Sequence, residues 1–241
     1  ATGGGTRRIT TDRYRTLRRV PGVDAVTARS LLELARSSGS VWKVAFSIGV
    51  LFVVTALLLD RVAAATGLSP APGIAFGTLL GLGTFTTYNW LTQFDDPREY
   101  LRYPIGMAAV FRGKLRAHLA LAVPTGSGYL ALAVFWYPPV DLLVGVVVFP
   151  LVAVYVAGLT AVLTGLSATE LLFDTAAFAV FGAGLAVLAV PLLVAALAAS
   201  TAPLVVGVVA VWIAFVFGVV GVVLARRAGS RWERRLREVD S

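Results

Sequence analysis

The lysine and arginine residues of this chain fall into three clusters, and long apolar stretches separate the clusters. Nine of the 21 basic residues lie between Arg7 and Lys43, five between Arg98 and Arg116, and six between Arg226 and Arg237, so only Arg61 lies outside a cluster. Lys and Arg accumulate on the cytoplasmic side of membranes, so this spacing predicts topology as well as class. It predicts a multi-pass membrane protein with both termini in the cytoplasm.

The composition agrees with a membrane protein and argues against several other classes. Hydrophobic residues make up 58% of the chain, charged residues 14%, and the mean hydropathy is +0.83, which lies outside the range of soluble globular proteins. A net charge of +8 can indicate nucleic-acid binding, but these charges flank apolar stretches of membrane length. Contact with lipid headgroups explains them better, so we expect membrane lipid as a partner and no nucleic acid. With no cysteine and one histidine, His118, we expect no metal site and no bound cofactor.

Six apolar stretches are long enough to cross a membrane, which requires about 20 residues for about 30 Å of hydrocarbon. They predict an all-α integral membrane domain over residues 23–225, with transmembrane helices at about 41–59, 73–94, 117–137, 140–166, 175–197 and 203–225. Six spans place the basic connector between spans two and three on the same side as both termini. Five or seven spans would put one terminal arginine cluster outside, so they are disfavoured.

Three segments flank this domain or lead into it. Residues 1–22 are rich in Gly, Thr and Arg and predict a flexible basic segment, or a linker from a preceding six-span half. Residues 23–38 alternate apolar and charged positions at helical spacing, which predicts an amphipathic helix on the inner membrane surface. Residues 226–241 form a basic cytoplasmic tail, either a short helix at the headgroups or a solvated stop-transfer segment.

The second span carries two patterns, each with two interpretations. Glycines at intervals of four favour close helix packing, either within the chain or at a subunit or pathway face: Gly73, Gly77 and Gly81. Polar residues near its inner end form interhelical hydrogen bonds or line a translocation path: Thr84, Thr87, Tyr88 and Asn89. The other ionisable residues lie at span ends, so we expect no buried charge pair of the kind that ion-coupled transporters use.

The connector between spans two and three is the most specific segment. Pro104 suits the start of a helix, after which Val110, Phe111 and Leu115 supply an apolar stripe while three basic residues stay polar. The segments Tyr103-Pro104-Ile105-Gly106 and Val110-Phe111-Arg112-Gly113-Lys114-Leu115 resemble the corresponding loop of ABC-2 type exporter permeases. In that family the loop reads Leu-Pro-Val/Ile-Ser, then polar residues, an apolar pair and Gly/Ala-Lys-Leu. Tyr103 and Gly106 depart from the usual Leu and Ser.

The resemblance implies six spans and a cytoplasmic coupling helix that docks on a separate ATPase subunit. The residues it assigns to docking are Tyr103, Pro104, Ile105, Val110, Phe111, Arg112 and Lys114. It implies that ATP and Mg are bound by that ATPase partner. It also implies a second six-span unit, as a homodimer, a heterodimer or a fused half, in the cell membrane. Drug, lipid, polysaccharide and peptide exporters share these features, so the substrate is not specified.

We expect no enzymatic activity from the chain itself. A phosphate-binding loop requires Gly-x4-Gly-Lys-Ser/Thr, whereas Gly113-Lys114 has Ala108 at the first Gly position and Leu115 at the last. No carboxylate and histidine set or Ser-Lys dyad suits an intramembrane hydrolase. The sequence therefore predicts the permease subunit of an ATP-driven exporter. The alternative is a membrane anchor or assembly subunit that transports nothing.

Overall fold

The computed structural model describes residues 13–36, 40–93, 95–168, 171 and 173–239. Residues 1–12 of the predicted flexible segment lie outside this description. The longer elements in the described part are helices: α2 (Ala25–Arg36), α3 (Ser40–Thr66), α4 (Pro72–Gly83), α5 (Phe85–Thr92), α6 (Pro97–Leu101), α7 (Met107–Ala133), α8 (Pro139–Thr164), α9 (Thr175–Ala198) and α10 (Pro203–Val239). The prediction of an all-α fold is confirmed for these residues.

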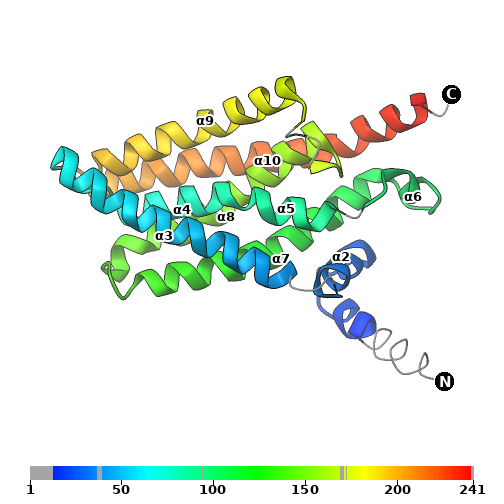
Figure 1. Cartoon of the computed structure of the whole chain (residues 1–241), viewed down its shortest axis with the longest axis horizontal. Helices are drawn as coiled ribbons and strands as arrows, with labels where there is room; N and C mark the ends of the chain where they lie inside the picture. Colours follow the sequence, from blue (N-terminus) through cyan, green and yellow to red (C-terminus); the bar gives the residue numbers. More distant parts are fainter. Residues whose placement is uncertain (1–12, 37–39, 94, 169–170, 172, 240–241) are drawn as a thin grey trace.

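The long helices run side by side along the length of the molecule (Figure 1). The connections from α3 to α4, from α7 to α8 and from α9 to α10 lie at one end. Helix α2, helix α6 and the last turns of α10 lie at the opposite end. We call this second end the basic end, because residues 13–36, 95–116 and 226–239 bring all three clusters of basic residues to it.

Among the described residues, four helices are long and apolar enough to cross a membrane: Val41–Thr66, Pro139–Thr164, Thr175–Ala198 and Pro203–Glu238. They correspond to the predicted spans one, four, five and six. Their outer faces expose valines and leucines, for example Val187, Val190 and Val194 of α9, which are 57–62% exposed. Such a surface suits lipid rather than water as its surroundings.

The predicted second span is not one helix, because α4 ends at Gly83 and α5 begins at Phe85. At the break, both the backbone N–H and the hydroxyl of Thr84 donate to the carbonyl of Gly81, over 3.2 and 2.6 Å. The backbone bond spans three residues, not the four of an α-helix, so the helical hydrogen-bond ladder is interrupted at Thr84. The predicted second span is therefore corrected to two helices, α4 and α5, that meet at Thr84.

The predicted coupling helix and the predicted third span form one helix, α7. It begins at Met107 rather than at Pro104, after Gly106 in an extended conformation, and continues to Ala133. Nothing between residues 107 and 133 ends the helix, and Pro124 lies within it. The connector contains a separate short helix, α6, which begins at Pro97 with Asp96 accepting from the N–H of Arg98.

The basic tail is also part of a longer helix than predicted, because α10 continues from the apolar stretch to Val239. The indole N–H of Trp232 donates to the carbonyl of Ala161 over 3.1 Å. The same ring covers Gly165, where an added Cβ would lie 2.7 Å from it. These contacts with α8 keep the tail in line with the bundle, so it does not form a separate helix at the headgroups.

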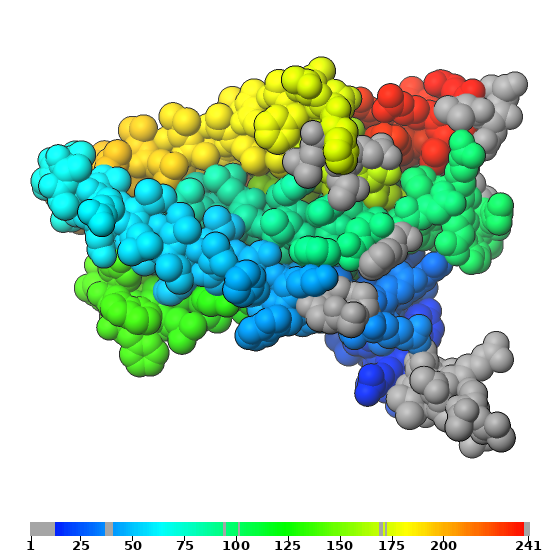
Figure 2. Space-filling view, viewed as in Figure 1, coloured from blue at the N-terminus to red at the C-terminus, as the bar shows by residue number. Residues whose placement is uncertain are grey.

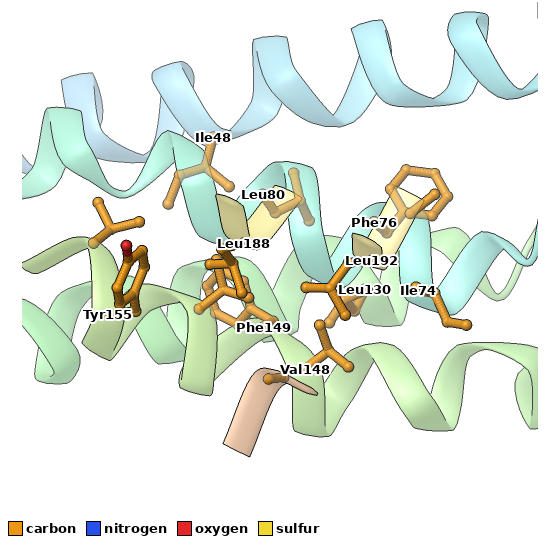
Figure 3. Close-up of a cluster of buried hydrophobic side chains, with 14 of the residues drawn as sticks. Ile48, Ile74, Phe76, Leu80, Leu130, Val148, Phe149, Tyr155, Leu188 and Leu192 are labelled. Atoms are coloured by element: carbon orange, nitrogen blue, oxygen red, sulfur yellow. The ribbon is translucent and has the colours of Figure 1, made fainter. Parts of the chain in front are cut away.

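The core lies where α4 packs on α8, with α3, α7 and α9 around them. Figure 3 shows side chains of these helices pointing toward one another. They are Ile74, Phe76 and Leu80 of α4, Val148, Phe149 and Tyr155 of α8, and Ile48, Leu130, Leu188 and Leu192 of the surrounding helices. This core positions the ends of α5, α7 and α10 that reach the basic end, and these ends carry the polar and charged side chains described next.

Candidate docking site at the basic end

Helix α2 is fastened to the first turns of α7 by a capping residue. Asp24 accepts from the N–H and the hydroxyl of Thr27, over 2.7 and 2.8 Å, and pairs with Arg116 over 3.0 Å. Partial burial acts to raise the pKa of Asp24, but the Thr27 hydrogen bonds and the Arg116 guanidinium lower it overall. The hydroxyl of Thr27 also donates to the carbonyl of Gly113. The helix is thus held by its own N-terminal cap.

A close approach between the two helices makes this attachment possible. A Cβ added at Gly113 would lie 2.6 Å from the Cβ of Val26, closer than side chains pack. Val26 belongs to the buried apolar cluster at the basic end, as do Phe111 and Met107. Only glycine at position 113 therefore lets α2 lie directly on α7.

A buried ion pair connects α5, α6 and α7. The ammonium of Lys114 lies 2.6 Å from the carboxylate of Asp95, and the two side chains are 1% and 5% exposed. Lys114 also donates to the carbonyl of Leu91 over 2.9 Å, and the hydroxyl of Tyr100 donates to Asp95 over 2.8 Å. Burial raises the pKa of the Asp95 carboxyl, and the Lys114 charge offsets part of that rise. The pair locks the connector onto the bundle.

Arg29 extends this network to α2. Its guanidinium lies 2.6 Å from Glu33 and 3.3 Å from Glu99, and 5.8 Å from the ring centroid of Tyr100. Burial and the nearby Asp95 carboxylate raise the pKa of Tyr100, which keeps its hydroxyl a donor. Arg29 thereby connects α2 to α6.

A groove of about 570 Å³ lies between α2 and the segment that follows α6. Its floor is apolar and aromatic, and arginines border it. The lining residues are Tyr14, Ala25, Val26, Arg29, Leu32, Glu33, Arg36, Tyr100, Tyr103, Pro104 and Ile105. In Figure 2 this region lies where the blue α2 meets the green connector. A concave apolar surface of this kind, with charges at its edge, suits a protruding segment of a partner protein.

The structure divides the predicted docking residues into two groups. Tyr103, Pro104 and Ile105 line the groove, with Tyr103 and Ile105 47% and 38% exposed. In contrast, Val110, Phe111 and Lys114 are at most 2% exposed. The apolar stripe that was expected to enter the ATPase is instead covered by α2, α8 and α10, because α7 is continuous and turns the stripe inward. Arg112 is exposed but does not line the groove.

The three spaced glycines all face α8. A Cβ added at Gly77 would lie 3.0 Å from the Cα of Gly145, and a Cβ added at Gly81 would lie 2.6 Å from the Cβ of Val152. Gly73 meets the backbone of α8 near Asp141 and Gly145. This is contact within the chain, made backbone to backbone.

The predicted path-lining residues lie among the helices of this chain. Thr84, Thr87 and Tyr88 are at most 1% exposed, and Asn89 is partly exposed. The hydroxyl of Tyr88 donates to the carbonyl of Gly165 over 2.9 Å, which connects α5 to the end of α8. In this conformation Thr84 and Tyr88 make contacts between and within helices, and a role in lining a path stays a prediction.

Sequence reasoning named three residues of the groove but missed the residues that brace it. Its expectation of no buried charge pair concerned the ionisable residues of the spans, and it made no prediction for the connector, where Asp95 and Lys114 form such a pair. Neither their separation of 19 residues nor any sequence motif predicts that these two residues pair. Asp24 was detectable, since a helix-capping Asp precedes Thr27 and an apolar run. The pairing of Arg29 with Glu99 requires α2 and α6 to be adjacent, which the sequence does not encode locally.

Comparison of the chain with protein-family models, with curated proteins and with solved structures found no match.

Proposed function

We propose that this chain is the membrane-spanning subunit of an ATP-driven exporter of the ABC-2 type, docked on a separate ATPase. The observation that carries the proposal is the groove between α2 and residues 100–105, at the end where the three basic clusters meet. A surface that is apolar at its floor, basic at its edge and braced by a buried ion pair suits a partner that must push on the membrane helices.

In this proposal the bundle crosses the membrane six times. The 12 residues of α4, Thr84 and the 8 residues of α5 together rise about 30 Å, enough for the hydrocarbon core. The apolar part of α7 supplies the third crossing, with α3, α8, α9 and α10 as the other four. The basic end then lies in the cytoplasm with both termini, in the cell membrane, by the positive-inside rule.

Docking is proposed to use the exposed part of the connector. Tyr103 and Ile105 act as apolar anchors, and the exposed Arg36 at the edge of the groove meets an acidic group on the ATPase. ATP and Mg are bound and hydrolysed on that partner. Two six-span units, as two chains or as fused halves, form the path between them, with Thr84, Thr87, Tyr88 and Asn89 on its lining when the helices move apart.

Substitution at the groove tests the proposal. Ile105→Asp places a charge among apolar groups, so we expect at least a tenfold loss of the ATPase activity that copurifies with the chain from native membranes. The matched control is Leu68→Asp, an exposed leucine at the opposite end, 45% exposed against 38% for Ile105. Wild-type protein that retains no ATPase would reject the exporter and leave the membrane anchor. Undiminished ATPase in the Ile105→Asp preparation would reject this groove.

Phe111 is unsuitable for the same test. Its side chain is 2% exposed inside the apolar cluster, so Phe111→Asp buries an unpaired charge and is expected to lower the amount of folded protein. A loss of ATPase binding in that variant reports on folding, not on docking.

A further inference from the structure

Helices α7 and α10 meet closely at the basic end. A Cβ added at Gly229 would lie 2.5 Å from the Cα of Ala108, so the two backbones almost touch at this point. The helices run in opposite directions, since α7 leaves the basic end and α10 arrives there (Figure 1). Their contact therefore forms a seam that continues toward the apolar part of the bundle.

Two arginines border this seam at the same depth. Arg112 follows Ala108 by four residues on α7, and Arg226 precedes Gly229 by three on α10. At 1.5 Å per residue Arg112 lies about 6 Å and Arg226 about 4.5 Å from the contact, both toward the apolar part. Around the axis of α7, Arg112 is rotated about 40° from Ala108, and around the axis of α10, Arg226 is rotated about 60° from Gly229. Because both helices are right-handed and antiparallel, these rotations carry both side chains to the same side of the seam.

Neither arginine is neutralised within the described part of the chain. Both side chains are exposed, and no carboxylate of a described residue lies within salt-bridge distance of either. Other arginines at this end are paired, for instance Arg116 with Asp24 and Arg237 with Glu233. Two guanidinium groups of like charge side by side on a rigid seam favour a bound anion.

The position of the seam identifies the source of the anion. Arg226 directly follows the apolar stretch of α10 that ends at Ala225, so it lies where lipid phosphates are found. Below it on the same side of α10, Val219 and Val223 are 49% and 40% exposed and offer an apolar track for an acyl chain. A free phosphate has no acyl chain to contact these valines.

We propose that Arg112 and Arg226 together bind the phosphate of an anionic phospholipid at the seam between α7 and α10. The two guanidinium groups donate charge-assisted hydrogen bonds to the phosphate oxygens, and the acyl chain lies along Val219 and Val223. The bound lipid bridges the two helices. The proposal rests on the membrane placement proposed above and is independent of the ATPase.

Native mass spectrometry of the purified chain in detergent, titrated with dioleoyl phosphatidylglycerol, tests this site. We expect phosphatidylglycerol to bind more tightly than phosphatidylcholine. Arg226→Gln and Arg112→Gln should each weaken it about thirtyfold, equivalent to about 2 kcal/mol for hydrogen bonds to a charged group. The matched control is Arg227→Gln, which removes the same charge at the same depth, about 100° around α10 from Arg226. It should weaken binding by no more than about fivefold, the effect of one charge near the surface.

Four results would overturn the proposal. Equal losses in the Arg226 and Arg227 variants would indicate diffuse surface attraction. No loss in either seam variant would show that the arginines do not bind lipid. No preference for phosphatidylglycerol over phosphatidylcholine would show that the lipid's charge is not recognised. Displacement of the lipid by millimolar inorganic phosphate would identify a free-anion site instead.

An unchanged melting temperature in each variant excludes unfolding as the cause of weaker lipid binding. None of these outcomes changes the result expected for ATPase copurification, so the two proposals fail separately.

Discussion

The buried ion pair between Lys114 and Asp95 gives the sharpest prediction about stability. Lys114→Met keeps the length and apolar stem of the side chain but leaves the Asp95 carboxylate, 5% exposed, opposite no cation. Removing one partner of a buried pair costs about 3–5 kcal/mol, because the remaining charge stays desolvated. It also removes the hydrogen bond to the Leu91 carbonyl, which holds the end of α5. We expect the melting temperature in detergent to fall by on the order of 10 °C.

The double variant separates the ion pair from other losses. In Lys114→Met with Asp95→Asn no charge remains buried, and most of the loss should be recovered. The interaction energy of the double-mutant cycle should then be about 2–3 kcal/mol. Tyr100→Phe is the matched control, since it removes only the 2.8 Å hydrogen bond to Asp95 and should cost about 1–2 kcal/mol. The measurement is thermal unfolding followed by tryptophan fluorescence.

The loss in Lys114→Met should also depend on pH. Burial raises the pKa of Asp95 above its ordinary 3.8, and removing the Lys114 charge raises it further. A carboxyl whose folded pKa lies above its unfolded value penalises folding above the raised pKa, and the penalty disappears as pH falls toward 3.8. The variant should therefore approach wild-type stability in mild acid. A loss below about 1 kcal/mol at neutral pH, or one that grows on acidification, would refute the buried pair.

Three further predictions concern packing, the α2 attachment and topology. Gly77→Leu should lower the free energy of unfolding by about 3 kcal/mol or more, because its Cβ would meet α8 at 3.0 Å. In the same melting assay Gly128→Leu, which has open space around it, should change stability little. The Asp24 contacts with α7 should persist above pH 3.8 and be lost as the pH falls through the lowered pKa of Asp24. Hydrogen exchange should show this as a loss of protection of the α2 amides in acid, and Asp24→Asn should make that protection independent of pH in this range. Cysteine at Thr66 should react with an impermeant reagent from outside the cell and cysteine at Arg98 only from inside, and external labelling at Arg98 would reject six spans.

The correct parts of the sequence prediction all depend on local composition. The apolar stretches at 41–59, 140–166, 175–197 and 203–225 appear as helices of membrane length, because transfer of side chains to lipid is nearly additive along a helix. The break at Thr84 was not predictable in this way. At Thr84 the backbone N–H bonds to the carbonyl of Gly81, three residues back, while the hydropathy of the segment is unchanged.

The sequence by itself determined that this is a bundle of apolar helices with its basic residues at one end, since hydropathy and charge act residue by residue. The tertiary structure decided which groups are available for function. Phe111 and Lys114 share the basic connector with Ile105, but only the packing of α2, α8 and α10 buries the first two and leaves the third exposed. Likewise, Asp95 meets Lys114, and Arg112 borders the seam with Arg226, only because antiparallel helices bring distant residues to one depth. Burial and pairing depend on neighbours in space, and one-dimensional patterns carry no such information.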